Sequence, residues 1–165
     1  MTLREGQTPA EELTQIIQIG VVVADVDKSI EGMRHVYGLE PDLVREMKYP
    51  ELRYRGQQED SWMRIASYNH FGVRIEFMEP LGPGASMLKD FLKESPYGHA
   101  LHHIRFNDVD DNDAITAMMA ERGVEVYQEG KPIMNPDGKF TFYDALPQLG
   151  FVTEVVTKAK KRDAV

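Results

Sequence analysis

The sequence predicts an α+β fold built from two similar halves. Strand-like and helix-like segments alternate along the 165 residues, and the order strand, helix, run of strands occurs twice. The strand around residues 18–25 leads into DVDKSIEGM, and about 85 residues later the strand around 103–108 leads into DVDDNDAITAMM. A chain of this length forms one domain, or two small modules that share a core.

In the first half, Thr8 with Glu11 three residues later has the pattern of a helix N-cap, which predicts a short helix there. Ile16 to Val23 is nearly continuous and β-branched, as in a buried strand. Asp27 is expected to cap a helix that Gly38 ends. Further strands are expected at 43–47, 51–54, 63–68 and 72–78, with a loop at 80–83 and a helix at 86–93.

The second half repeats the order of the first. We expect a strand at 102–107, a helix at 110–122 ended by Gly123, a strand at 124–128, a turn at 135–138, and a final hairpin of 139–144 with 151–157. These segments suggest four regions: an N-terminal helical extension at 1–15, a first module with its connecting helix at 16–97, a second module at 98–158, and a basic tail at 159–165.

Composition excludes several classes of function. With 19 Lys and Arg against 27 Asp and Glu, the net charge of -8 repels nucleic acids and anionic membranes. The absence of cysteine excludes disulfides, thiolate zinc sites, iron–sulfur clusters and cysteine nucleophiles. No apolar stretch is long enough to span a membrane and no signal peptide is visible, so we expect a cytoplasmic protein with no membrane partner.

Three polar side chains interrupt otherwise apolar strands. Gln18 lies between two isoleucines, Glu76 lies between Ile75 and Phe77, and Glu154 lies within the last strand. A carboxylate in a buried strand costs several kcal/mol unless it is paired or binds a metal. One such residue fits a strand with a solvent-facing side. Two of them, with an interior glutamine and histidine at the starts of the two halves, are better explained by a bound cation.

Five histidines are present, and three of them are interpreted as solvated: His35, His70 and His99. His102 and His103 are adjacent in a predicted strand. Because neighbouring strand residues face opposite sides, we expect only one of the two to point into a given cavity.

The chain resembles the vicinal-oxygen-chelate (glyoxalase) superfamily over about residues 16–156, and within it the methylmalonyl-CoA epimerases. The stretches that carry the resemblance are IEFMEPLGPGASMLKDFLKESPYGHALHHIRF, ERGVEVYQEG and GFVTEVV. The resemblance implies paired βαβββ modules that form a curved, mixed and mostly antiparallel sheet around a metal-binding cavity. It also implies a homodimer.

The resemblance assigns Gln18 and His103 as first-strand metal ligands, and Glu76 and Glu154 as last-strand ligands. One divalent ion, Zn, Mn, Co or Ni, is expected in such an oxygen-rich site. The set Gln, Glu, His, Glu is similar to that of some glyoxalase I enzymes. That resemblance implies that Glu154 or Glu76 leaves the metal and acts as the base. The epimerases carry a glutamate near their third strand, whereas this chain has Trp62-Met63-Arg64 there.

We therefore expect a metal-dependent isomerase or epimerase that moves a proton alpha to a carbonyl, like methylmalonyl-CoA epimerase. The alternatives are a glyoxalase I-like lactoylglutathione lyase and a non-catalytic small-molecule binding protein of the bleomycin-resistance type. Alternation along the strands puts Arg74 on the face of Glu76, and Arg105 on the face of His103. Two guanidiniums there suit a small anionic substrate, possibly an acyl-CoA. The alternative is structural pairing with Glu76, Glu154 or Asp144.

Overall fold

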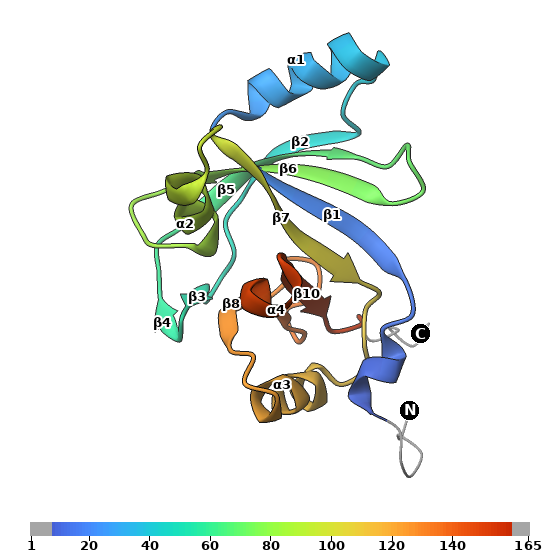
Figure 1. The fold of residues 1–165 in the computed structure, drawn as a ribbon, viewed down its shortest axis with the longest axis vertical. Coiled ribbons are helices and arrows are strands. Elements are labelled where there is room, and N and C mark those ends of the chain that lie inside the picture. The colour runs from blue at the N-terminus through green and yellow to red at the C-terminus, as the bar shows by residue number, and fades with distance from the viewer. Residues whose placement is uncertain (1–7, 160–165) are drawn as a thin grey trace, which may run out of the picture.

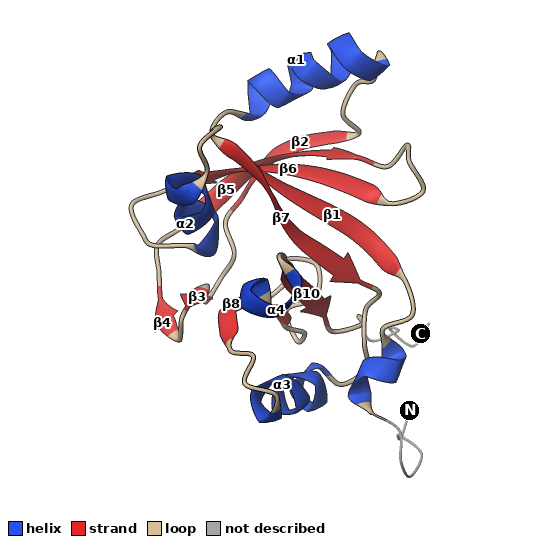
Figure 2. Ribbon diagram, in the orientation of Figure 1, coloured by secondary structure: helices blue, strands red, loops and turns tan. Residues whose placement is uncertain are grey.

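The computed structural model describes residues 8–159. Its elements are a ten-stranded mixed sheet, four α-helices and a 3₁₀ helix, η1 (Pro9–Glu12), that precedes the first strand. The helices α1 (Val26–Tyr37) and α3 (Asn112–Glu121) lie at opposite ends of the molecule (Figure 1), and the strands between them form one curved layer (Figure 2). The predicted α+β class is confirmed.

We call β1 to β6 with α1 the first half, and β7 to β10 with α3 and α4 the second half. The strands of the first half are β1 (Ile16–Val23), β2 (Leu43–Met47), β3 (Arg53–Tyr54), β4 (Gln57–Gln58), β5 (Trp62–Tyr68) and β6 (Arg74–Leu81). Helix α2 (Met87–Glu94) connects them to β7 (His99–Phe106), β8 (Val126–Gly130), β9 (Phe140–Tyr143), α4 (Leu146–Leu149) and β10 (Val152–Val156). Across the sheet the order is β2-β5-β6-β1-β7-β10-β9-β8-β3-β4.

The two halves meet where β1 and β7 pair antiparallel. Gln18 is opposite Arg105, and Gly20 is opposite His103. In the repeat of 85 residues, position 18 corresponds to position 103 and position 20 corresponds to position 105. The repeat therefore relates the Gln18–Arg105 pair to the Gly20–His103 pair. On the outer side of each central strand runs a parallel neighbour, β6 beside β1 and β10 beside β7. The halves are thus related by an approximate two-fold axis between β1 and β7.

A short hairpin makes the sheet curl. Strands β3 and β4 follow β2 in the chain, yet β3 pairs with β8 at the far side of the second half. Residues 48–52, which join β2 to β3, span at most about 20 Å when extended. The two ends of the sheet must therefore lie close together. The curled sheet encloses the largest apolar cluster, which contains Val22, Met78, Phe140, Phe142 and Val152.

Each long helix is fixed to its own half in a different way. Helix α1 buries Ile30 and Met33 against Ala66 and Tyr68 of β5. Helix α3 buries Ile115 and Met118 in an apolar cluster with β9 and β10.

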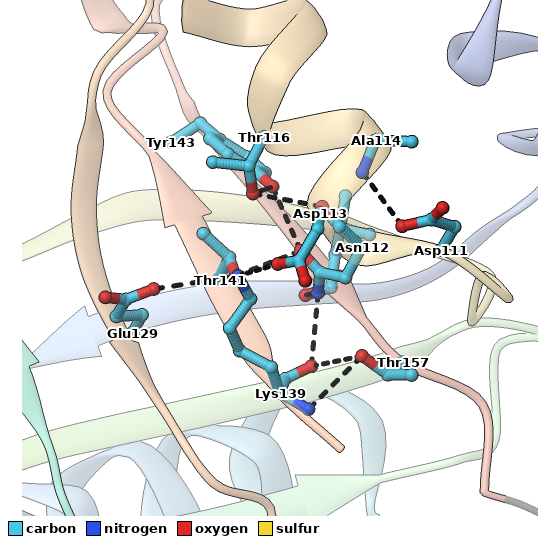
Figure 3. A network of polar contacts seen from close by, with 11 residues as sticks. Asp111, Asn112, Asp113, Ala114, Thr116, Glu129, Lys139, Thr141, Tyr143 and Thr157 are labelled. Atoms are coloured by element: carbon cyan, nitrogen blue, oxygen red, sulfur yellow. Dashed lines mark hydrogen bonds and ion pairs between the residues drawn. The ribbon is translucent and has the colours of Figure 1, made fainter.

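In addition, the buried Asn112 joins α3 to both strands, as Figure 3 shows. Its amide nitrogen donates to the carbonyl oxygens of Lys139 and Val155, and its oxygen accepts from the hydroxyls of Thr141 and Tyr143. All four hydrogen-bonding positions of this amide are thereby used.

Several local predictions were wrong in detail. Asp25, not Asp27, caps α1, because its carboxylate accepts from the backbone nitrogens of Asp27 and Lys28. Asp27 instead forms a bidentate ion pair with Arg64. Strand β6 continues through the start of the expected loop to Leu81, since its pairing with β5 extends to Trp62. Strand β4 and helix α4 were not predicted.

The end of α1 is as predicted, with Gly38 in the left-handed conformation at a φ of 68°. None of the helices in residues 8–159 has both the length and the apolar character needed to cross a membrane.

Candidate metal centre

The four predicted ligands lie on four consecutive strands of the sheet, one on each. Glu76 is on β6, Gln18 on β1, His103 on β7 and Glu154 on β10, and these strands are neighbours in that order. Gln18, His103 and Glu154 expose 4%, 1% and 6% of their surface, so all three lie inside the curled sheet. Four chemically compatible donors thus come from distant parts of the sequence.

The same register relation holds in both halves. Glu76 of β6 pairs with Gly20, which lies two residues after Gln18. Glu154 of β10 pairs with Arg105, which lies two residues after His103. Each half therefore offers one amide or imidazole and one carboxylate in equivalent positions.

The side chains contact one another in sequence. The Gln18 amide nitrogen is 3.1 Å from Glu76 Oε2 and 3.2 Å from His103 Nε2. His103 Nε2 is in turn 3.2 Å from Glu154 Oε2. Neighbouring ligand atoms about 2.1 Å from an octahedral ion are about 3.0 Å apart, so these separations are close to those of such a site.

The two carboxylates differ in what holds them. Glu76 accepts hydrogen bonds on both oxygens, from Gln18 and from the Ser67 hydroxyl at 3.0 Å. Glu154 Oε2 is buried and has no hydrogen-bond donor in residues 8–159, because its contact with His103 does not have hydrogen-bond geometry. A buried carboxylate oxygen without a donor is costly, and a cation would satisfy it.

The surroundings also shift the acidities of these groups in opposite directions. Burial and the negative charge of Glu154 raise the pKa of Glu76. Burial acts in the same sense on Glu154, but the neighbouring His103 imidazole and the guanidiniums of Arg105 and Arg74 hold its pKa below the usual range. Glu154 is therefore the carboxylate whose ionised form the site favours.

Both adjacent histidines are buried inside the curled sheet, although neighbouring residues of a regular strand face opposite sides. The pairing of β1 with β7 goes from Gly20–His103 directly to Val21–Leu101, so His102 is the extra residue of a β-bulge. The two Nδ1 atoms are 2.9 Å apart, and the His102 ring is fully buried against Phe91. Burial, followed by the proximity of His103, holds the pKa of His102 well below its usual value.

The Nδ1 atom of a neutral His102 can accept a hydrogen bond from the Nδ1–H group of His103. The Nε2 atom of His103 then presents a lone pair to the centre. Sequence reasoning did not assign this orienting role to His102, since alternation along a regular strand does not anticipate a bulge.

Gly20 was also not identified as a site residue from the sequence. A Cβ atom there would lie 2.1 Å from His103 Cε1 and 2.4 Å from Nδ1, distances that no real contact shows. The imidazole therefore occupies the space that a side chain at this position would take. A glycine inside an otherwise β-branched strand was the available signal, because such a glycine often marks close approach of another group.

The types of donor fit a divalent ion. The four side chains contact one another in pairs and do not surround a common position for the ion. No three His, Asp or Glu side chains of residues 8–159 are already arranged to hold an ion. The Gln18 amide, drawn with nitrogen toward its partners, presents oxygen there after a half-turn. Gln18 oxygen, His103 Nε2 and the two carboxylates then form a nitrogen and oxygen set that suits Zn, Mn, Co or Ni.

The centre opens into a cavity of about 420 Å³ whose wall includes Gln18, Glu76 and Glu154. Arg74 and Arg105 line the same cavity. Arg74 is exposed and donates to Asn69, whereas Arg105 is half-buried and donates to Asp108 at 2.8 Å. Neither guanidinium makes a direct ion pair with Glu76, Glu154 or Asp144, and Arg105 Nε is buried without a partner among residues 8–159.

A second cavity, of about 440 Å³, lies between α1 and the outer surface of β1. Its wall is mostly apolar and contains none of the four ligands. The inner cavity is the better candidate site, since converging polar groups mark a site more specifically than volume does.

Residues 17–142 match the family model described as the Glyoxalase/Bleomycin resistance protein/Dioxygenase superfamily. No curated protein sequence matches the chain.

Similar solved structures include methylmalonyl-CoA epimerases. A variant of the Streptomyces coelicolor enzyme in complex with 2-nitronate-propionyl-CoA is 26% identical, with a TM-score of 0.62, over 90% of this chain and 99% of that one. A methylmalonyl-CoA epimerase in complex with methylmalonyl-CoA and NH4+ is 25% identical, with a TM-score of 0.62, over 92% and 99%. The Mycobacterium tuberculosis enzyme, at 19% identity, a TM-score of 0.62 and coverage of 90% and 91%, shows the fold alone.

Proposed function

The chain belongs to the Glyoxalase/Bleomycin resistance protein/Dioxygenase superfamily, and we propose that it moves a proton on the carbon next to the carbonyl of an anionic acyl-CoA. The observation that carries this proposal is the chain of contacts from Glu76 through Gln18 and His103 to Glu154, with Gln18, Glu76 and Glu154 in the wall of one cavity. The likeness to epimerase structures that hold acyl-CoA ligands supports the choice of substrate.

Gln18, Glu76, His103 and Glu154 would hold one divalent ion, either Zn, Mn, Co or Ni. When bound, the ion supplies positive charge that stabilises an enolate oxygen. The rest of the chemistry falls to the side chains of the chain itself.

Glu154 is the better candidate for the base. Its Oε2 has no hydrogen-bond donor within residues 8–159, whereas Glu76 Oε1 accepts from the Ser67 hydroxyl, a bond that does not depend on the orientation of the Gln18 amide. Glu154 would then be the carboxylate that leaves the ion, takes the proton from the substrate carbon and returns it.

Arg74 and Arg105 would bind the negative charge of the substrate. Both line the cavity, and Arg105 Nε has no partner within residues 8–159. A guanidinium pairs with a carboxylate through two parallel hydrogen bonds, which orients as well as binds it. We expect the enzyme to act as a homodimer, which light scattering coupled to size-exclusion chromatography would show.

Deuterium exchange tests the reaction directly. Protein loaded with Co²⁺ is incubated in D₂O with methylmalonyl-CoA, and uptake at the carbon next to the thioester is followed by mass spectrometry. We expect exchange by the wild type, and a loss of about 100-fold or more in Glu154→Gln.

Turnover of the methylglyoxal–glutathione adduct in place of exchange would support a glyoxalase I-like lyase. Tight binding of a small molecule with neither activity would support a binding protein of the bleomycin-resistance type.

A further inference from the structure

Tyr49 is a cavity residue that the proposed reaction does not yet use. It lies in the segment that joins β2 to β3, and it lines the same cavity as Glu76 and Glu154. Its ring packs edge-on against Phe140 of β9, with ring centroids 4.7 Å apart. A residue of the first half thus reaches across to the second half at the side of the candidate centre.

The hydroxyl of Tyr49 is free. Within residues 8–159 it makes no hydrogen bond, while Tyr54 and Tyr127 both donate to Asp90 and Tyr143 donates to Asn112. A tyrosine that is largely enclosed usually finds a partner for its hydroxyl. A free donor at the wall of a cavity is available to a ligand that enters it.

Charged groups of the cavity surround this phenol. Burial, together with the charges of Glu76 and Glu154, raises the pKa of Tyr49, and Arg45 and Arg105 act in the opposite sense. All four of these charged residues line the same cavity. The hydroxyl therefore stays protonated and acts as a hydrogen-bond donor, not as a base.

The backbone around Tyr49 is held in place. Pro50 follows it and restricts Tyr49 to an extended conformation. Glu51 has a φ of 56°, in the left-handed region, and its carboxylate pairs with Lys131 of the second half at 3.1 Å. The segment next to Tyr49 is thus tied to the second half by this ion pair.

Strand β5 presents no carboxylate to the cavity. Ile65 and Ser67 are the β5 residues that line the cavity, and Ser67 is engaged with Glu76. The remaining acid, Asp108, is paired with Arg105. Among the side-chain hydroxyls that line the cavity, Ser67 donates to Glu76 and Thr157 donates to the Lys139 carbonyl, so only the Tyr49 hydroxyl is uncommitted within residues 8–159.

We propose that the Tyr49 hydroxyl donates a hydrogen bond to the substrate oxygen on which negative charge develops as the proton leaves. This role rests on the proposed function for its substrate, but the donor itself can be tested with a simple anion. Oxalate presents paired anionic oxygens like those of an enolate next to a carbonyl, and its binding requires no turnover.

The test compares oxalate binding to the Co²⁺-loaded wild type, Tyr49→Phe and Tyr54→Phe by isothermal titration calorimetry. Phenylalanine keeps the ring against Phe140 and removes only the hydroxyl. We expect Tyr49→Phe to bind oxalate about tenfold more weakly, as for the loss of one hydrogen bond to a charged oxygen. Tyr54→Phe, whose hydroxyl contacts Asp90 outside this cavity, is the matched control and should bind oxalate like the wild type.

A kinetic experiment tests the same role, because the loss of the hydroxyl should change kcat much more than KM. In the deuterium-exchange assay, Tyr49→Phe should lower kcat about 100-fold and leave KM within threefold, because the bond strengthens as charge develops. Equal oxalate affinities, no oxalate binding by the wild type, or an unchanged kcat would each overturn the proposal. If the wild type exchanges no deuterium, the proposed function fails, and the oxalate comparison still decides the role of Tyr49.

Discussion

The two halves of the sheet place equivalent residues in unequal surroundings. Gln18 and His103 occupy equivalent positions on β1 and β7. Gln18 pairs with Arg105, two residues after His103, and His103 pairs with Gly20, two residues after Gln18. Across from the His103 ring is Gly20, and across from the smaller Gln18 amide is Arg105. The larger ligand, His103, therefore requires a glycine at the paired position of β1. The smaller ligand, Gln18, is paired with an arginine.

The carboxylates show the same inequality. Glu76 is held at both oxygens, whereas Glu154 has a buried oxygen without a donor in the part of the chain that the structure describes, and it lies near Arg105. A repeat of the fold thus supplies the positions of the four side chains, and the departures from the repeat divide their tasks.

The largest effect is expected from Gly20→Ala. The new Cβ would overlap the His103 ring, so the imidazole must move away from Gln18 and Glu154. We expect the affinity for Co²⁺, measured by calorimetry, to fall about 100-fold. Arg105→Ala changes the equivalent position of the second half and should not weaken Co²⁺ binding. Wild-type affinity in Gly20→Ala would show that this close approach does not position His103.

The attachment of the two helices gives the next comparison. Asn112→Ala removes four buried hydrogen bonds that fix α3 and leaves the hydroxyls of Thr141 and Tyr143 without their acceptor (Figure 3). We expect the free energy of unfolding in urea to fall by about 2–3 kcal/mol. In the first half, Asp27→Asn breaks only an exposed ion pair with Arg64 and should leave the free energy unchanged. Equal losses in the two variants would contradict this distinction.

The two cavity arginines should differ in their effect on substrate binding. The Arg105 side chain is 20% exposed, whereas Arg74 is exposed at the cavity mouth, so the charge of Arg105 is less screened by water. We expect Arg105→Leu to raise KM for methylmalonyl-CoA about tenfold and Arg74→Leu about threefold, both with unchanged metal content. Unchanged kinetics in Arg105→Leu would remove the anion-binding role.

The smallest effect concerns pH at the junction of the halves, where Tyr54 of β3 and Tyr127 of β8 share Asp90. Burial and the hydrogen bond to Asp90 raise the pKa of Tyr127 in the folded chain. The unfolded phenol ionises near pH 10, so the stabilisation is present below pH 10 and is lost as the pH rises above it.

We expect the wild type to lose about 1 kcal/mol of unfolding free energy from this group between pH 10 and 11. Tyr127→Phe should lose correspondingly less over the same interval, and the exposed Tyr37→Phe of the first half is the control. Identical pH dependence in wild type and Tyr127→Phe would contradict the assignment.

Much of the fold could be predicted because its signals are local. The β-branched run of β1, the glycine that ends α1, and the recurrence of strand, helix and strands all depend on neighbouring residues. Polar residues within apolar strands pointed to Gln18, Glu76 and Glu154, because burial of such groups is costly wherever the strands end up. The structure brings these residues and His103 together, and their role as metal ligands stays a prediction.

The remaining features depend on pairing between distant segments. The bulge at His102 exists only in the register of β7 against β1, so alternation within β7 could not show that both histidines are buried. The pairing of β3 with β8 joins two-residue and five-residue strands more than 70 residues apart, and it is this pairing that brings the segment of Tyr49 over the cavity. Neither feature has a local sequence pattern.

Metal stoichiometry tests the central claim most directly. Wild type and His103→Ala are dialysed together against Co²⁺, and the bound metal is measured by elemental analysis. One ion per chain in the wild type, and none in His103→Ala, is the result expected if the two halves enclose a single ion. No bound ion in the wild type, or the same content in both proteins, would contradict the account.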